Sequence, residues 1–209
     1  MYFHKMPNVI QKFHPNYTWH KSREQKVLYI TFDDGPIPEV TDFVLDTLKI
    51  YNAKATFFCV GENVKKHPQQ FNAIVKKRHV IANHTFNHLN GWDTETEKYI
   101  NNISACEKEV SSVTRKYSQK MFRPPYGRIK KAQYEYLKDD YEVIMWDVLT
   151  GDFDQNLDKE KCLSESIKAT SNGSIIVFHD SIKAKENMMY VLPKFLAHFS
   201  QLGYTFEVL

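Results

Sequence analysis

Residues 30–36 read ITFDDGP, and this stretch carries the first indication of the fold. An apolar run rich in β-branched and aromatic residues ends here in two adjacent carboxylates, Asp33 and Asp34, and Gly35-Pro36 then turns the chain. The run predicts a buried β-strand. The turn alone would account for the carboxylates, but two unpaired carboxylates side by side raise the pKa of one of them. A bound cation would remove this penalty, so the stretch is either a plain turn or part of a metal site.

The chain continues as a regular alternation of strand and helix patterns. Six further short runs rich in β-branched or aromatic residues occupy 55–60, 79–83, 121–124, 142–148, 174–179 and 204–209. Helical patterns between them cover 38–52, 94–113, 157–171 and 187–203. Strands that alternate with helices are joined by crossovers and therefore run parallel. The sequence predicts an α/β domain with about seven parallel strands.

Reactive side chains follow most of these strands at their carboxyl ends. His84 follows the third run, Arg123 ends the fourth and His179 ends the sixth, while acidic residues between 147 and 152 follow the fifth. An open sheet would concentrate a site near one switch point. A barrel brings all the strand ends to one rim. We therefore expect a TIM-like (β/α) barrel, incomplete because seven strands are counted and not eight.

Composition limits the class of protein. The 209 residues are enough for one large domain, and a net charge of +3 indicates no nucleic-acid partner. Residues 1–24 are polar and aromatic and are expected to form an N-terminal arm packed on a single domain of residues 25–209. No window predicts a membrane span, and the N-terminus lacks a signal-peptide pattern, so a cytoplasmic location is expected. Three distant cysteines predict reduced thiols and no disulfide framework.

His84 and His88, in HTFNH, are candidate metal ligands. Their four-residue spacing would place both rings on one face of a helical turn, although two surface histidines are an equally good interpretation of the pair alone. Thr85 stands where metalloproteases of the H-E-x-x-H type carry their glutamate, so a catalytic base must come from elsewhere. One Asp of the DDG turn would complete a set of two histidines and one carboxylate, and the other would remain a free base.

Two further motifs carry candidate catalytic groups. In RPPYG, residues 123–127, Arg123 is either a rigid partner for a carboxylate or part of a surface salt bridge, and the N–H after the prolines could meet an oxyanion. In SIIVFHD, residues 174–180, His179 ends an apolar strand and is a candidate general acid opposite the carboxylates. Ile175, Val177 and His179 share one strand face, so the two aliphatic side chains could line a small apolar pocket.

TFDDG, HTFNH, RPPYG and IIVFHD, in this order, resemble the polysaccharide deacetylases of carbohydrate esterase family 4, the NodB-homology domain. The resemblance spans roughly residues 27–209. It implies a distorted (β/α) barrel and a metal-dependent hydrolase that removes N-acetyl groups from a sugar or polysaccharide and releases acetate. One divalent ion is implied, zinc first, with cobalt, nickel and ferrous iron as alternatives. An O-acetyl esterase of the acetylxylan type and a non-catalytic carbohydrate-binding relative stay open.

The resemblance also implies roles for single residues. Asp34, His84 and His88 would hold the metal, Asp33 would take the proton of the attacking water, and His179 would protonate the leaving amine. An iron-dependent oxygenase also uses two histidines and one carboxylate. Its first histidine and acid are commonly two residues apart on a β-sandwich, whereas here the acid precedes both histidines by about fifty residues in an α/β chain.

The remaining residues implied by the resemblance surround the reacting group. Arg123 would orient the base, and the N–H of Tyr126 would bind the oxyanion, while its ring could stack on a sugar. Ile175 and Val177 would receive the acetyl methyl group. Trp146 either walls the sugar site or packs in the core beside the fifth strand.

The sequence departs from the family pattern after the fifth strand. The family motif Asp-x-x-Asp-Trp is replaced by LTGDF at residues 149–153, so that Leu149 stands in place of the first Asp. In the family an acidic residue of this motif pairs with the catalytic His or the Arg. Asp152 is the expected partner of His179, and Asp147 and Asp180 are the alternatives.

Overall fold

The computed structural model describes residues 2–114 and 120–209. Its strands are β1 Val27–Asp33, β2 Ala55–Cys59, β3 Val80–Asn83, β4 Met121–Phe122, β5 Glu142–Val143, β6 Val148–Leu149, β7 Ile175–His179 and β8 Thr205–Phe206. Its α-helices are α1 Asn8–Phe13, α2 Val40–Ile50, α3 Gly61–Lys66, α4 Pro68–Lys76, α5 Thr96–Val113, α6 Lys131–Leu137, α7 Lys159–Ala169 and α8 Lys185–Gln201. Two 3₁₀ turns, η1 Gly91–Asp93 and η2 Pro125–Gly127, follow β3 and β4.

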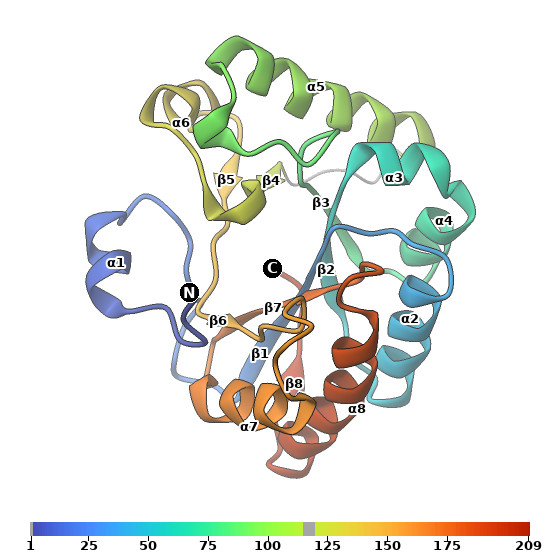
Figure 1. Cartoon of the computed structure of the whole chain (residues 1–209). Helices are drawn as coiled ribbons and strands as arrows, with labels where there is room; N and C mark the ends of the chain where they lie inside the picture. Colours follow the sequence, from blue (N-terminus) through green and yellow to red (C-terminus); the bar gives the residue numbers. More distant parts are fainter. Residues whose placement is uncertain (1, 115–119) are drawn as a thin grey trace.

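The strands form a curled sheet with helices around its outer face (Figure 1). Seven of them follow in the order β5-β4-β3-β2-β1-β7-β6, and β8 adds to β1. Every pairing between them is parallel. The expected distorted barrel is therefore confirmed.

The two faces of β1 separate the outer core from the barrel interior. Leu28, Ile30 and Phe32 pack with buried residues of α2 and α8 in the large core between sheet and helices. The residues between them point inward, and the register places Thr31 beside Val177 and Asp33 beside His179. The carboxyl end of the barrel interior therefore carries the reactive groups.

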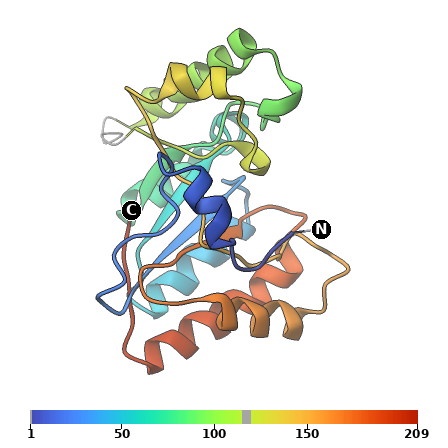
Figure 2. The ribbon, with the colours of Figure 1, turned by 90° about the vertical axis from the view of Figure 1, so that its left-hand side faces the viewer.

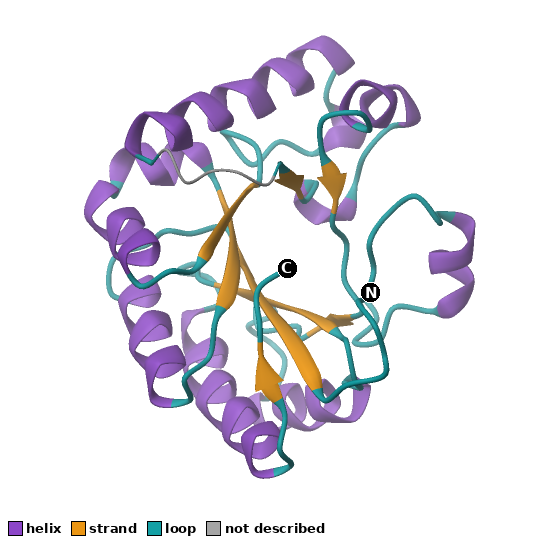
Figure 3. Cartoon of the chain, turned by 180° about the vertical axis from the view of Figure 1, so that it is seen from behind, coloured by secondary structure: helices purple, strands orange, loops and turns teal. Residues whose placement is uncertain are grey.

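The barrel interior directly below the reactive groups is apolar. Phe58, Ala82, Met121, Ile144 and Ile175 form a separate buried cluster there, and Leu209 at the C-terminus packs against it. The seven-strand ring surrounds this terminus, as Figures 1 and 3 show. The barrel is thus plugged below the reactive groups and accessible at the carboxyl ends of the strands.

The predicted strand at 142–148 is wrong as one element, because the structure divides it into β5 and β6. β5 pairs with β4, whereas β6 pairs with β7 on the other side of the barrel. Between them, the carbonyls of Ile144 and Met145 accept hydrogen bonds from the Arg123 guanidinium at 3.3 and 2.9 Å. The Met145 N–H donates to the carbonyl of Thr18. The backbone between β5 and β6 is therefore held partly by Arg123 and by the N-terminal segment, and it leaves a gap between these two strands, here called the seam.

The N-terminal arm lies along this seam. Isolated bridges join Lys5 to Val148 and Thr18 to Ile144. Asp147, fully buried at the seam, forms ion pairs with Lys5 at 2.8 Å and Arg23 at 2.9 Å. Figure 2 views the molecule from this side, with α1 in front of the sheet. The arm thus supplies backbone and charged partners where the sheet lacks a strand.

Two other expectations concern the whole chain. Cys59, Cys106 and Cys162 are free, buried thiols. Among the helices of the described ranges, none combines the length and the apolar character that a membrane crossing requires.

Candidate active site

Arg123 fixes the orientation of Asp33 at the rim of the barrel. Its guanidinium is fully buried, and Nη1 donates to Asp33 Oδ1 at 2.6 Å and to Thr31 Oγ1 at 2.8 Å. The Phe58 ring lies beneath it, with its centroid 4.0 Å from Cζ. The other carboxylate oxygen, Asp33 Oδ2, lies 3.9 Å from His84 Nε2. One oxygen of Asp33 is thus held by Arg123, and the other faces the histidines.

Asp34, His84 and His88 converge on one point. Asp34 Oδ1 is 3.2 Å from His88 Nε2 and 3.8 Å from His84 Nε2, and the three ligand atoms lie within 4.8 Å of one another. Asp34 reaches this position through a left-handed backbone conformation with φ 85°. Asp33 and Asp34 therefore face different partners although they are neighbours in the chain.

The electrostatics of the group suit metal ligation. His84 Nδ1–H donates to the Arg123 carbonyl at 2.7 Å, which leaves the Nε2 lone pair directed at Asp34. Burial lowers the pKa of His84 to about 4, so its imidazole is neutral. Burial raises the pKa of Asp34, but the His88 hydrogen bond and the charges of the nearby histidines outweigh this effect and hold that pKa below its usual range.

These donors fit one divalent metal ion. Ligands at about 2.0–2.2 Å in a tetrahedral zinc site are roughly 3.3 Å from one another. Asp34 Oδ1 lies 3.2 and 3.8 Å from the two imidazole nitrogens, so small movements would bring the three atoms onto one ion. Neutral imidazole nitrogens with one carboxylate oxygen are ligands that zinc prefers, and three of them leave a coordination position open. The site thus has the composition of a catalytic centre and not of a closed structural one.

The predicted helical turn at HTFNH is wrong, because residues 84–90 form a loop. Thr85 and His88 have positive φ angles of 64° and 55°. The loop N–H groups have side-chain acceptors in place of helical carbonyls: Thr85 N–H donates to Asn83 Oδ1 at 2.9 Å. The two histidine rings still meet, with their centroids 5.1 Å apart.

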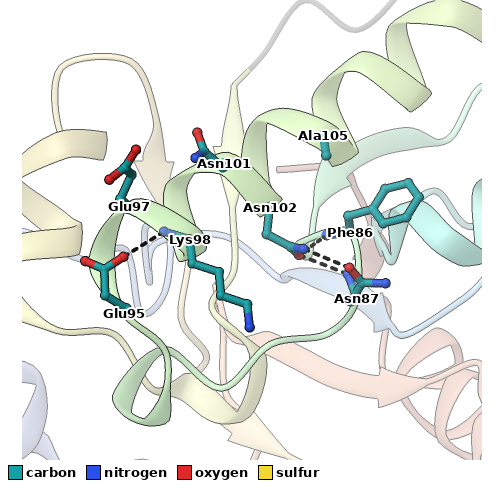
Figure 4. A pocket seen from close by; sticks show the side chains of 8 residues that line it. All are labelled: Phe86, Asn87, Glu95, Glu97, Lys98, Asn101, Asn102 and Ala105. Carbon is teal, nitrogen blue, oxygen red and sulfur yellow. Dashed lines mark hydrogen bonds between the residues drawn. The ribbon is translucent and has the colours of Figure 1, made fainter.

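Asn102 of α5 holds the outer side of this loop. Its Oδ1 accepts the N–H groups of Phe86 and Asn87 at 2.8 and 3.0 Å, and its Nδ2 donates to Asn87 Oδ1. Figure 4 shows this arrangement in a shallow polar hollow beside α5. Sequence reasoning missed Asn83 and Asn102, because an asparagine beside a strand or on a polar helix carries no pattern of its own.

Asp152 is the residue that holds His179. His179 Nδ1 lies 2.7 Å from Asp152 Oδ1, and the His179 backbone N–H donates to Asp152 Oδ2 at 2.8 Å. Burial lowers the pKa of His179, but the charge of Asp152 and its hydrogen bond raise it overall to about 9. His179 therefore carries a proton at neutral pH. The buried Leu149 makes no such contact, so the second half of the altered motif supplies the partner.

The two alternative partners of His179 have other contacts. Asp147 belongs to the seam, as described above. Asp180 is buried and braces the DDG turn: its carboxylate accepts the Gly35 N–H at 3.0 Å and the Thr41 hydroxyl at 2.6 Å. A Cβ on Gly35 would lie 1.9 Å from Asp180 Oδ2, so this position excludes every larger residue.

Tyr126 lies beside the candidate metal ligand His88, and Trp146 packs against Gly127 of the same RPPYG loop. Tyr126 has φ 60°, is 61% exposed, and its ring meets His88 edge-on at 4.7 Å. Its N–H donates to no acceptor within the described ranges. Trp146 is half-buried, and its ring edge packs so closely on Gly127 that a Cβ there would lie 2.6 Å from Cη2. Tyr126 is thus exposed beside His88, whereas Trp146 packs against Gly127 and against a buried core cluster that includes Met145. A contact of Trp146 with a sugar stays a prediction.

Ile175 and Val177, the two aliphatic residues predicted to line the acetyl pocket, lie at different depths in the barrel. Val177 is in register with Thr31, one layer below Asp33 and His179. Ile175 is in register with Tyr29 and belongs to the apolar plug. At about 3.3 Å per residue it lies roughly 13 Å from His179 along β7. Val177 is thus the nearer of the two to the reactive groups, and a contact of either with an acetyl group stays a prediction.

A parallel half-barrel with a candidate metal site and a buried acid–base set at its rim defines a class of metal-dependent hydrolases. Residues 20–142, more than half of the chain, match the family described as polysaccharide deacetylase, and the chain belongs to this family. Enzymes of this family are metal-dependent in general, and the Asp34 group provides a suitable site.

Individual relatives agree with this assignment. A peptidoglycan-N-acetylglucosamine deacetylase of Bacillus cereus is 33% identical over 191 residues, which are 90% of this chain and 89% of that protein. The peptidoglycan-N-acetylglucosamine deacetylase PgdA of Listeria monocytogenes is 32% identical over 163 residues. These residues are 77% of this chain but 34% of that relative, so this chain corresponds to about a third of it.

A solved structure matches almost the whole chain. The crystal structure of a peptidoglycan N-acetylglucosamine deacetylase in complex with 4-naphthalen-1-yl-N-oxidanyl-benzamide superposes with a TM-score of 0.89 and 28% identity. It covers 98% of this chain and 95% of that one. The likeness includes the N-terminal arm, which the family match at residues 20–142 largely leaves out.

Proposed function

We propose that this polysaccharide deacetylase removes the N-acetyl group of an N-acetylglucosamine unit in a peptidoglycan-type glycan. The observation that carries the proposal is the placement of the Asp33 carboxylate, with its Oδ2 not bonded to Arg123, between a metal-ligand set and a protonated histidine, His179. The relatives reported above, both named for peptidoglycan N-acetylglucosamine, favour this substrate.

Asp34, His84 and His88 would hold the metal, with zinc as the ion that the donor set favours. When bound, such an ion polarises a carbonyl and makes water more acidic. Asp33 is the base that takes the proton of the attacking water. Arg123 fixes its orientation, because the guanidinium occupies Oδ1 and leaves Oδ2 free toward the histidines.

His179 would give its proton to the leaving nitrogen. An amine is expelled only when it is protonated, so an acid is needed on the side opposite the base. Asp152 keeps His179 charged and fixes Nδ1, which leaves Nε2 as the donor atom. The Tyr126 N–H would hold the carbonyl oxygen as it gains charge, and Val177 and Ile175 remain the proposed apolar residues for the methyl group.

Acetate release tests this proposal. Peptidoglycan fragments, chito-oligosaccharide and acetylxylan should be offered to the same preparation, and its metal content should be measured. The proposal predicts acetate from the N-acetylated glycans, loss of release with a chelator, and recovery when zinc is returned. Acetate from acetylxylan alone would instead indicate an O-acetyl esterase. A full metal site with no acetate from any glycan would indicate a carbohydrate-binding protein.

A further inference from the structure

A pocket of about 800 Å³, a volume within the range of small-ligand sites, lies between the N-terminal arm and the barrel. Its lining comes from α1, from the segments before and after this helix, and from Ser171 in front of β7. The arm reaches the start of β7 through the bridge between His20 and Ser174. At about 3.3 Å per residue, Ser174 lies roughly 16 Å from His179 along this strand. The pocket therefore lies toward the amino end of the sheet and takes no part in the roles given above.

The barrel holds the walls of this pocket in place. The Trp19 side chain is buried in a core cluster, and its indole N–H donates to the His14 carbonyl at 3.0 Å. The backbone N–H of Lys21 donates to the Gly173 carbonyl at 2.9 Å. The arm packs so closely on this turn that a Cβ on Gly173 would clash with the carbonyl oxygen of Ser22. The pocket is therefore formed by segments whose positions are fixed by hydrogen bonds and packing.

The lining of this pocket is cationic. Among the described residues that line it none is acidic, whereas Lys5, Lys12 and Arg23 carry positive charges. Lys5 and Arg23 share a single carboxylate, that of the buried Asp147, at 2.8 and 2.9 Å. Lys12 forms no ion pair within the described part of the chain. Three cations against one carboxylate leave a surplus of two positive charges beside the pocket, which favours an anionic ligand.

The Arg23 guanidinium is held by one of its nitrogens, and its side chain is 37% exposed. Nη1 donates to Ser171 Oγ at 3.0 Å and to the Asn172 carbonyl at 2.6 Å, in addition to its ion pair with Asp147. Nε and Nη2 have no acceptor among the residues that the structure describes. A guanidinium presents its donors as a planar fork that matches two oxygens of a phosphate or carboxylate. One nitrogen of Arg23 therefore fixes the side chain, and the other two are available to a ligand.

We propose that this pocket binds an anionic ligand through an oxyanion, a phosphate or a carboxylate group, that contacts Lys5, Lys12 and the Nε and Nη2 atoms of Arg23. The volume leaves room for a body of the size of a sugar next to the charged group. The inference goes beyond the proposed function and does not depend on it, because no group at the rim of the barrel takes part. A bound anion would offset the charge surplus beside Asp147, so it should also raise Tm.

Calorimetry with three matched sugars tests this proposal. Glucose 6-phosphate, glucuronic acid and glucose carry a phosphate, a carboxylate and no charge on the same kind of ring. At least one of the two anionic sugars should bind at low salt, and the one that binds identifies the oxyanion. Its affinity should fall as the salt concentration rises, and glucose should not bind. The proposal is overturned if neither anion binds, if glucose binds equally well, or if the protein binds only to anionic lipid vesicles.

Substitutions and one NMR signal locate the bound anion. Lys12→Met should weaken its affinity about tenfold, the effect of one lost charge-assisted hydrogen bond. Arg23→Lys keeps the charge beside Asp147 but removes the planar fork, so it should also weaken binding. Lys108→Met, at an exposed position of α5, removes the same charge elsewhere and should leave the affinity unchanged. The indole N–H signal of Trp19, which lines the pocket, should shift when the anion is added. An affinity that neither pocket variant changes, or an unmoved Trp19 signal, would place the anion elsewhere and refute the proposal.

Discussion

Arg123 Nη1 lies 2.6 Å from Asp33 Oδ1, and both side chains are almost closed off from solvent. The pair joins the end of β4 to the end of β1, and the remaining guanidinium donors bind two carbonyls of the β5–β6 seam. Removing one partner of a buried pair leaves an uncompensated charge, which typically costs about 3–5 kcal/mol. The same contact therefore supports the fold and the proposed base.

Arg123→Met is expected to lower the free energy of unfolding by about 3–5 kcal/mol and kcat by at least about a hundredfold. Urea unfolding and acetate release measure the two effects. Arg123→Lys is the matched variant: it keeps the charge but cannot reach Asp33 and both carbonyls together, so an intermediate loss is expected. A fully stable and active Arg123→Met enzyme would refute this part of the account.

Asp152→Asn should move the basic limb of the pH–rate profile to lower pH. His179 must carry its proton to act as the acid, so activity falls as the pH rises through its pKa, which Asp152 raises to about 9. Loss of the carboxylate charge should lower that limit by roughly one unit or more. The profile of kcat/KM measures the shift, and Asp139→Asn, an exposed site, is the control. An unmoved limb would remove His179 or its partner from the mechanism.

The same pair predicts a pH dependence of stability. The pKa of His179 in the folded protein lies above the ordinary value of 6.5, so its pairing with Asp152 stabilises the fold fully below about pH 6.5. This stabilisation disappears as the pH rises through about 9. Asp152→Asn should therefore lower the free energy of unfolding more at pH 6 than at pH 10. Equal losses at both values would contradict the assignment.

His84→Ala and His88→Ala should each weaken metal binding by at least about a hundredfold. Loss of a ligand costs more than loss of a residue that only hydrogen-bonds to a ligand. Metal content after gel filtration and the rise of Tm on adding zinc measure the effect. His14→Ala, an exposed histidine of the arm, should leave both unchanged. Metal content that survives either ligand substitution would show that the site is wrongly assigned.

The arm is expected to contribute to stability through Asp147. Burial raises the pKa of Asp147, but Arg23, Lys5 and Ser174 outweigh this effect and lower it overall, so the stabilisation is present at neutral pH and is lost as the pH falls through the folded pKa. Lys5→Ala with Arg23→Ala should lower the free energy of unfolding by about 1–3 kcal/mol at pH 7. Thermal or urea unfolding checks this, with Lys12→Ala as the control. Equal stability of both variants would contradict it.

Much of the fold and of the site could be predicted from short sequence motifs and from the repeated alternation of strand and helix patterns. The polar groups that end successive strands predicted a shared rim, and the HTFNH, DDG and HD motifs predicted the groups that the structure brings together. The division of residues 142–148 into two strands could not be predicted from the sequence, because it depends on Arg123 and the N-terminal arm, which are both distant along the chain. The loop at His84 depends likewise on Asn102. The arm boundary at residue 24 and the cytoplasmic location stay predictions.

Asp33→Asn tests the central claim most directly. The substitution keeps the shape of the side chain and leaves Asp34, His84 and His88 in place, so metal content should equal that of the unaltered protein. Acetate release should fall by about 10²–10⁴-fold, the range of a lost general base. Asp46→Asn, at a surface carboxylate paired with Lys77, is the control and should release acetate normally. An Asp33→Asn enzyme that binds metal and releases acetate at the unaltered rate would contradict the account.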